Sequence, residues 1–433
     1  MKALVNEGHI VASISANMQN NKVRAQRMLA AIDYAKNVWI HKNRVNEKIA
    51  FIGHSRGGEA VTTAAREHFI HSGQTAGAVI SLMGTDNQEG GGDPEFLLSP
   101  ISTSYLALVA GRDEDVVGTC IPIINGCGNM GRNAASLYDR VGREWGFWDV
   151  GDYMIDKSIK LLPKFSHASW FNDLNGVWGI NSPNYFALTQ RKVVHEYVIR
   201  FLDWQLNGNT SQRQYFDGTR ETNLIPGVIN QYVQHSTPNL VIDTFENFVI
   251  QNNDWGKNLV FVSGPASFSE GAISLFDRTI PNESHGLAIR WKQHEPSIIK
   301  WTFPKNGDIY HIPTADVSNY PFLSFRATQI YGSRLNKDTD PKARIRLTDI
   351  RNRSAEVLIG ANTAFTLPNV ELQGPLSAQF GLVNTVTNMM RTLRIPISAF
   401  ANIDLSAIRS VSIIVGQDSP QGAIVIDSIE FSH

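Results

Sequence analysis

The chain has 433 residues, more than a single hydrophobic core usually organises, so two domains are expected. Its 39 lysines and arginines nearly balance its 40 aspartates and glutamates, and no basic stripe is interleaved with aromatic residues. This balance argues against nucleic acid or anionic lipid as a partner and favours an uncharged substrate. No apolar stretch reaches the roughly 18 to 20 residues that a membrane-spanning helix needs.

The first half of the sequence alternates short apolar runs with helical periodicity, which is the pattern of βαβ units around a parallel sheet. Strands are predicted at 10–14, 49–52, 76–82 and 105–110, and helices around 28–39, 61–69 and 194–204. The dipeptide Asn207-Gly208 is expected to end the last helix. We therefore predict an α/β domain over residues 1–208.

The sequence changes character after this helix. Residues 209–239 are rich in Asn, Gln, Thr, Ser and Gly and are predicted to form a connecting segment. From 240 to 433, short runs with period-two alternation follow one another, with turn residues between them and hardly any helical stretch. This pattern predicts an antiparallel β-sandwich domain over 240–433.

A Gly-x-Ser-x-Gly pattern lies between a predicted buried strand and a predicted helix, at Gly53, Ser55 and Gly57. In a nucleophile elbow of this kind the serine backbone is strained and its Oγ points into a cleft. Both glycines are expected to be needed so that the strand and the helix can approach each other. The alternative is a tight strand-to-helix connection without catalytic meaning.

Candidates for the other catalytic groups follow the serine along the chain. Asp113 follows the predicted strand 105–110 and His167 comes much later, the chain order that α/β-hydrolases use. A serine hydroxyl becomes nucleophilic when an imidazole takes its proton and a carboxylate holds that imidazole. Asp115 is the alternative acid. The triad Ser55, Asp113 and His167 predicts hydrolysis of carboxylic esters through an acyl-enzyme, without a cofactor.

These motifs resemble the chlorophyllase, platelet-activating-factor acetylhydrolase and polyester-hydrolase-like branch of the α/β-hydrolases. The resemblance covers about the first 206 residues and rests on 6–14, 53–58, 113–117 and 165–172. It implies a serine esterase or lipase whose oxyanion is held partly by the backbone amide of Arg56. An arginine after the nucleophile also resembles glucuronoyl esterases, so a polysaccharide or glucuronoyl-type esterase is an alternative. The Arg56 guanidinium then binds an oxyanion or a substrate carboxylate, or else pairs with a nearby acid.

The same resemblance predicts an incomplete sheet. Residues 10–14 correspond to the family's fourth strand, no His-Gly oxyanion loop precedes them, and the family's third strand is missing. We therefore expect an N-terminally truncated chain with a gap inside its parallel sheet, where backbone groups would lack partners. An export signal would have been lost with the upstream residues, so a secreted or periplasmic protein is expected.

Two cysteines occur, Cys120 and Cys127, separated by six residues. This spacing allows a small disulfide ring, and the alternative is two separate buried thiols.

Residues 240–433 resemble galactose-binding-like jelly rolls, a group that includes many carbohydrate-binding modules. The resemblance rests on 241–246, 320–326, 392–396 and 422–431. It implies that the first and last strands lie together and that Glu246 and Asp427 share a structural calcium ion. The alternative is that both are solvated acids on edge strands.

Three tryptophans of this domain are candidates for stacking on sugars: Trp255, Trp291 and Trp301. Trp291 and Trp301 fall in predicted strands and are expected to be core residues instead. The esterase prediction implies a small-molecule or polymeric ester as the partner. The competing hypothesis is a carbohydrate- or surface-binding protein, with polysaccharide as its partner, whose hydrolase domain is catalytically impaired.

Overall fold

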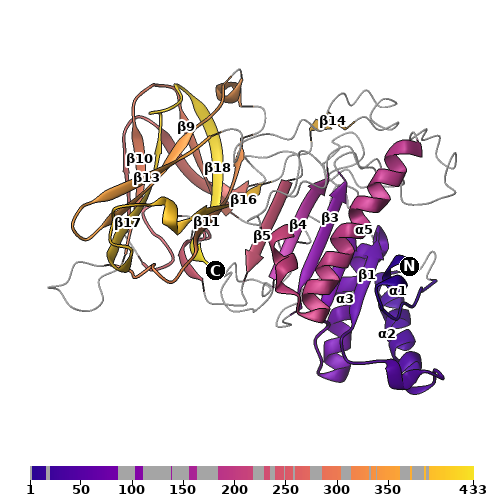
Figure 1. The fold of residues 1–433 in the computed structure, drawn as a ribbon. Helices are drawn as coiled ribbons and strands as arrows, with labels where there is room; N and C mark the ends of the chain where they lie inside the picture. Colours follow the sequence, from indigo (N-terminus) through magenta and orange to yellow (C-terminus); the bar gives the residue numbers. More distant parts are fainter. Residues whose placement is uncertain are drawn as a thin grey trace. The chain divides into compact units, whose positions relative to one another are not determined.

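The computed structural model is shown in Figure 1. It describes residues 2–15, 20–85, 103–110, 138, 156–162, 184–217, 229–234, 239–247, 249–256, 259–273, 285–303, 314–330, 333–337, 339–360, 371–372, 385–386 and 390–433. The chain divides into two units. The N-terminal unit comprises Met1–Ser236 with Thr279–Pro281 and Pro368–Thr387, and the C-terminal unit comprises the rest of Thr237–His433.

The N-terminal unit contains a five-stranded sheet in the order β1-β2-β3-β4-β5. Its strands are β1 (Ala50–His54), β2 (Ala78–Leu82), β3 (Tyr105–Ala110), β4 (Asp156–Leu162) and β5 (Ile229–Gln234). The first four are parallel and β5 is antiparallel to β4. Sequence periodicity did not reveal β4, and β5 lies in the predicted connecting segment.

The helices of this unit lie around the sheet, with α3 and α5 on its opposite faces (Figure 1). They are α1 (Lys2–Asn6), α2 (Asn21–Asn37), α3 (Arg56–Ser72) and α5 (Asn184–Asn207), with 3₁₀ turns η1 (Lys42–Arg44) and η4 (Thr210–Tyr215). Helix α5 packs against Ile80 and Leu108, whereas α3 meets Ser81 on the opposite face through Gly58. As predicted, α5 ends before a glycine with positive φ, Gly208 at 76°.

The strand predicted at residues 10–14 is not formed, because this segment pairs with no strand among the described residues. Ile10 is half exposed. A five-residue extended segment is a strand only when a neighbouring backbone supplies its hydrogen bonds. Consequently β1 ends the sheet, and the expected internal gap is absent from the five strands described.

The C-terminal unit consists of two antiparallel sheets. One has the order β13-β12-β17-β10-β7, and the other has the order β16-β11-β18-β9-β8 with β6 paired to β18. The strands are β6 (Leu240–Asp243), β7 (Val260–Ser263), β8 (Ser267–Ala272), β9 (His285–Trp291), β10 (Ser297–Thr302), β11 (Phe322–Gln329), β12 (Ala343–Asp349), β13 (Ser354–Ile359), β16 (Arg391–Pro396), β17 (Ile408–Val415) and β18 (Gly422–Ser432). The predicted sandwich, with its first and last strands together, is confirmed.

Short elements complete the described chain. Strands β14 (Glu371–Leu372) and β15 (Thr385–Val386) form a separate pair, and 3₁₀ turns occur as η5 (Arg334–Asn336), η6 (Ile397–Ala399) and η7 (Leu405–Ala407). None of the helices in the described part of the chain combines the length and apolar character needed to cross a bilayer.

The sandwich core follows from strand alternation. In β12, Ala343, Ile345 and Leu347 are buried, while the residues between them are partly exposed. Trp291 and Trp301 are 2% and 1% exposed, so the prediction that they are core residues is confirmed.

Candidate active site

Ser55 lies in the sharp connection between β1 and α3, and its backbone adopts a conformation that L-residues rarely take. Its φ is 56° and its ψ is −129°. Such a backbone costs of the order of 1–3 kcal/mol and persists only where surrounding contacts impose it. The serine therefore occupies a strained strand-to-helix turn, as the Gly-x-Ser-x-Gly pattern predicts.

Two backbone hydrogen bonds hold this turn against the end of β2, and a third closes the turn itself. The Ser55 N–H donates to the Leu82 carbonyl oxygen at 3.1 Å. The Ser55 carbonyl oxygen accepts from the N–H groups of Gly58, at 2.8 Å, and Thr85, at 3.3 Å. Both peptide groups that flank the Ser55 α-carbon are thus held by hydrogen bonds, which restricts where its side chain points.

Two glycines make the close packing of this turn possible. A β-carbon on Gly53 would overlap the carbonyl group of Gly57. A β-carbon on Gly58 would lie 2.7 Å from Ser81 Oγ and 2.8 Å from the α-carbon of Gly84. A β-carbon on Gly57 would meet open space, so the prediction that Gly57 must be small is wrong. Sequence reasoning missed Gly58, because only the packed structure shows which of two adjacent glycines faces β2.

Glu59 is a buried acid that ties the nucleophile turn to the residues after β2. Its side chain is 1% exposed, and its Oε2 accepts a hydrogen bond from Thr85 Oγ1 at 2.7 Å. Because the backbone N–H of Thr85 also donates to the Ser55 carbonyl oxygen, Glu59 supports the turn indirectly, through Thr85. Glu59 lies in the first turn of α3, where an acid interacts favourably with the helix dipole. This position is the feature of the sequence that could have indicated Glu59.

A cavity of about 1450 Å³ borders Ser55. It is lined by residues 8–14 and by residues of β1, α2 and α5. All five residues of β1 line it, although side chains of a strand alternate between two faces. The cavity therefore borders the edge of β1 that is opposite to β2. The serine thus lies where the sheet ends and open space begins.

Arg56 is the first residue of α3. The first N–H groups of a helix have no acceptor within the helix, and they carry its positive dipole end. This is the position that the predicted oxyanion role of the Arg56 amide requires.

The remaining predicted groups of this unit lie outside the described residues. They are Asp113, Asp115, His167, Cys120 and Cys127. The catalytic base, the acid and the disulfide therefore stay predictions.

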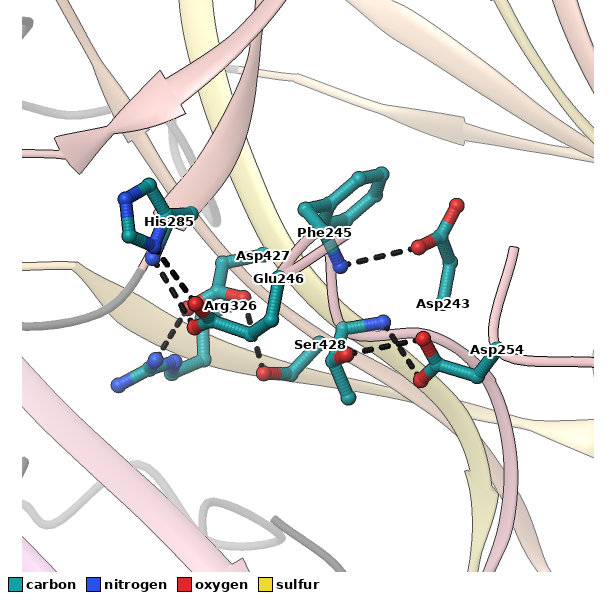
Figure 2. Close-up of polar contacts among 9 residues, drawn as sticks. Asp243, Phe245, Glu246, Asp254, His285, Arg326, Asp427 and Ser428 are labelled. Carbon is teal, nitrogen blue, oxygen red and sulfur yellow. Dashed lines mark hydrogen bonds and ion pairs between the residues drawn. The ribbon is translucent and has the colours of Figure 1, made fainter. Parts of the chain in front are cut away.

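In the C-terminal unit, the two predicted calcium ligands have separate protein partners (Figure 2). Glu246 accepts hydrogen bonds from the His285 N–H at 3.0 Å and from its Nδ1 at 2.6 Å. Asp427 pairs with Arg326 and accepts from Ser428 Oγ at 2.9 Å. The Glu246 and Asp427 side chains are 7% and 1% exposed, so the alternative of solvated edge acids is wrong.

The shared calcium ion itself stays a prediction. Within the described ranges, no group of three or more His, Cys, Asp or Glu residues is arranged to hold a metal. Calcium prefers six to eight oxygen ligands, and two carboxylates with protein donors supply few of them.

Three carboxyl groups of the C-terminal unit have raised pKa values. Burial raises the pKa of Asp243 to about 8, although Asp243 accepts hydrogen bonds from the Phe245 N–H at 2.9 Å and from Trp301 Nε1 at 2.7 Å. Burial also raises the pKa of Glu270 to about 7 and the pKa of Glu430 to about 7. Removal from water outweighs the hydrogen bonds that favour the charged form of Asp243.

The outer face of the β13-β12-β17-β10-β7 sheet carries an exposed aromatic ring. Phe261 lies opposite Lys300 in the β7–β10 pair and is 52% exposed. The Lys300 ammonium lies 5.1 Å from the centre of this ring. Further along the same row, Arg346 pairs with Glu356 across β12 and β13. This face therefore combines an apolar ring with charged hydrogen-bonding groups.

No protein-family model matches the sequence, and no curated protein matches it. Among solved structures, the family 11 carbohydrate-binding module of a cellulosomal cellulase of Clostridium thermocellum is similar, with a TM-score of 0.28 and 14% identity. That similarity covers 46% of this chain and 96% of the module. An exo-beta-agarase is similar over 45% of this chain and 24% of its own, with a TM-score of 0.27 and 17% identity. Similarities this weak assign neither a ligand nor an activity.

Proposed function

We propose that the N-terminal unit is a serine hydrolase that cleaves carboxylic esters, with Ser55 as the nucleophile. The observation that carries this proposal is the strained Ser55 backbone beside an open cavity. Strain of this kind is costly for stability and is found where geometry serves a function. The four parallel strands, the helices on both faces and the turn after β1 support an α/β-hydrolase architecture for this unit.

In the proposed reaction, Ser55 Oγ attacks the ester carbonyl carbon while an imidazole, assigned to His167, removes the hydroxyl proton. Asp113, or alternatively Asp115, keeps the imidazole in the required tautomer. The Arg56 N–H donates to the oxyanion. The alcohol leaves with the proton from the imidazolium, and a water molecule then releases the acid from Ser55 by the same steps in reverse.

A fluorophosphonate probe tests this proposal, because it reacts covalently with an activated serine. We expect labelling of the full chain at Ser55, located by peptide mass spectrometry, and its loss in Ser55→Ala. Ser13→Ala is the matched control, since Ser13 lines the same cavity from an ordinary backbone conformation. A folded protein that never labels would exclude the esterase and leave the binding hypothesis.

A second candidate function, carbohydrate binding by the C-terminal unit, is favoured by the exposed ring of Phe261 on the outer sheet face. An apolar ring face packs against the C–H groups of a sugar, and Lys300 and Arg346 offer donors to its hydroxyl oxygens. A polysaccharide-binding domain linked to an esterase would hold the enzyme on a polymeric substrate. Secretion of the protein stays a prediction.

Affinity electrophoresis in gels containing mixed-linkage β-glucan, xylan or agarose tests this second function. Retardation of the full chain by one polymer is expected, with a clear loss of retardation in Phe261→Ala. Val262→Ala is the control, because Val262 is a neighbouring residue that is 43% exposed. Equal migration of all three proteins in every gel would remove this candidate.

A further inference from the structure

The cavity beside Ser55 is lined by positive charge. Its basic lining residues are Arg24, Arg44, Lys48, Arg56, Arg191 and Lys192, and no aspartate or glutamate lines it among the residues that the structure describes. Lys48 Nζ donates to the Leu206 carbonyl oxygen at 2.7 Å. The whole chain has 39 basic and 40 acidic residues, so this wall does not reflect the average composition. A concave surface lined by one sign of charge concentrates ligands of the opposite sign.

These cations reach the cavity from separate elements. Arg191 and Lys192 lie on α5, Arg24 lies on α2, and Lys48 precedes β1. The Arg24 side chain is 6% exposed, and its Nη1 donates to Asn21 Oδ1 at 3.2 Å. A charge at a buried wall interacts more strongly with an anion in the cavity than the same charge does across water.

The rest of the lining is apolar. Helix α2 contributes Met28 and Ile32, and helix α5 contributes Val194, Val198 and Leu202. An apolar wall beside cationic groups matches a ligand that has an apolar body and one negatively charged end. The ester would lie at Ser55, with the apolar body along the helices and the charged end among the cations.

We propose that this cavity selects esters of anionic amphiphiles, in which a short apolar chain carries a carboxylate or phosphate away from the scissile bond. This proposal rests on the esterase function proposed above and names its substrate class. It replaces the expectation of an uncharged substrate, which follows from the net charge of the chain and takes no account of where the charges lie. Carboxylate and phosphate share the recognition chemistry of arginine and lysine.

The first experiment measures binding without catalysis. Octanoate and octyl phosphate are titrated calorimetrically into the full chain, with 1-octanol as the uncharged analogue. We expect one binding site for an anion, with binding that is tighter than for 1-octanol and weakens as NaCl rises from about 0.05 to about 0.5 M. The anion that binds more tightly shows whether the site prefers a carboxylate or a phosphate.

Charge reversal locates the site. Lys192→Glu should weaken anion binding about tenfold and leave 1-octanol binding unchanged. Lys22→Glu is the matched control: Lys22 is an exposed lysine of α2 that does not line the cavity, and its reversal should change neither affinity. Equal affinities for octanoate and 1-octanol, or an unchanged affinity in Lys192→Glu, would overturn the proposal.

The second experiment measures selectivity in turnover. The ratio of kcat/KM for the 4-nitrophenyl monoester of glutaric acid to kcat/KM for 4-nitrophenyl pentanoate should fall about tenfold in Lys192→Glu. Fluorophosphonate labelling at Ser55 with no preference for anions would refute the substrate class and retain the esterase. Anion binding without labelling would refute the esterase and retain the anion site.

Discussion

The two units complete their sheets in different ways. In the C-terminal unit, β6 pairs with β18, and buried apolar residues of both sheets form one core. In the N-terminal unit, β1 ends the sheet beside a cavity, and the strained Ser55 follows that strand. The comparison shows one unit that encloses its apolar surface and another that keeps open space next to the candidate nucleophile Ser55.

Charged side chains follow the same division. In the C-terminal unit, Arg326 and Asp427 neutralise each other in the interior, and burial favours the protonated form of Asp243. In the N-terminal unit, cations gather around a cavity. An ion pair inside a sandwich neutralises its own charges, whereas a cavity wall that carries one sign of charge attracts ligands of the opposite sign.

The largest expected effect concerns the buried pair of the sandwich. Arg326→Ala leaves the Asp427 carboxylate, whose side chain is 1% exposed, without its cation. Breaking a buried ion pair from one side typically costs about 3–5 kcal/mol of the free energy of unfolding. Urea unfolding followed by pulse proteolysis, with mass spectrometry of the fragments, should show that the C-terminal unit becomes susceptible first.

The double variant Arg326→Met with Asp427→Leu is the control for this pair. Since it buries no charge, it should recover much of the lost stability. If Arg326→Ala were as stable as the original protein, the prediction would be wrong, and water would have to reach the pair.

The pH dependence of the sandwich is the next largest effect. Because the pKa of Asp243 is raised to about 8 from 3.8, the folded state retains a proton that the unfolded state loses between these values. Its stabilising contribution is therefore full below about pH 4 and is lost as pH rises towards 8. Relative to Asp243→Asn, the free energy of unfolding should fall by about 1 kcal/mol per pH unit from pH 5 to 8.

Asp316→Asn is the control for this titration. Hydrogen bonds from Ser318 lower the pKa of Asp316, so its contribution is lost only as pH falls below the unfolded value and is constant from pH 5 to 8. Parallel stability curves for Asp243→Asn and the original protein would contradict the raised pKa.

A smaller effect concerns the turn around Ser55. Gly53→Ala places a β-carbon against the Gly57 carbonyl, and such overpacking costs about 1–3 kcal/mol. Gly57→Ala meets open space and replaces a helical glycine, so it should stabilise α3 by up to about 1 kcal/mol. Thermal unfolding and fluorophosphonate labelling would both distinguish the two variants, and equal behaviour would show that the turn is more pliable than its packing indicates.

The smallest effect is expected at the sandwich surface. Arg344 Nε and Nη2 donate to the two carboxylate oxygens of Asp418 at 2.6 and 2.7 Å, but both side chains are partly exposed. Arg344→Ala should lower the free energy of unfolding by at most about 1 kcal/mol, and less in high salt. Urea unfolding at two salt concentrations checks this, and a loss above about 2 kcal/mol would place the pair among the buried ones.

Much of the architecture follows from local pattern. Alternation predicted the sandwich strands, because a strand with one buried face must alternate whatever its neighbours are. The Gly-x-Ser-x-Gly pattern predicted the strained turn, because few residues tolerate that backbone. The prediction of a strand at 10–14 failed because a short run of mainly apolar residues specifies only an extended segment, and a partner strand is needed to make it a strand.

The chain alone therefore indicates the two fold classes, the helix ends and Ser55 as the nucleophile candidate, all of which depend on backbone rules acting over a few residues. Tertiary structure decided which glycine supports the turn, that Glu246 binds His285, and that Asp427 binds Arg326. It also gathered the cations of α2, α5 and the approach to β1 around one cavity. These outcomes depend on side chains that are distant in the sequence, and electrostatic and packing energies depend on separation in space.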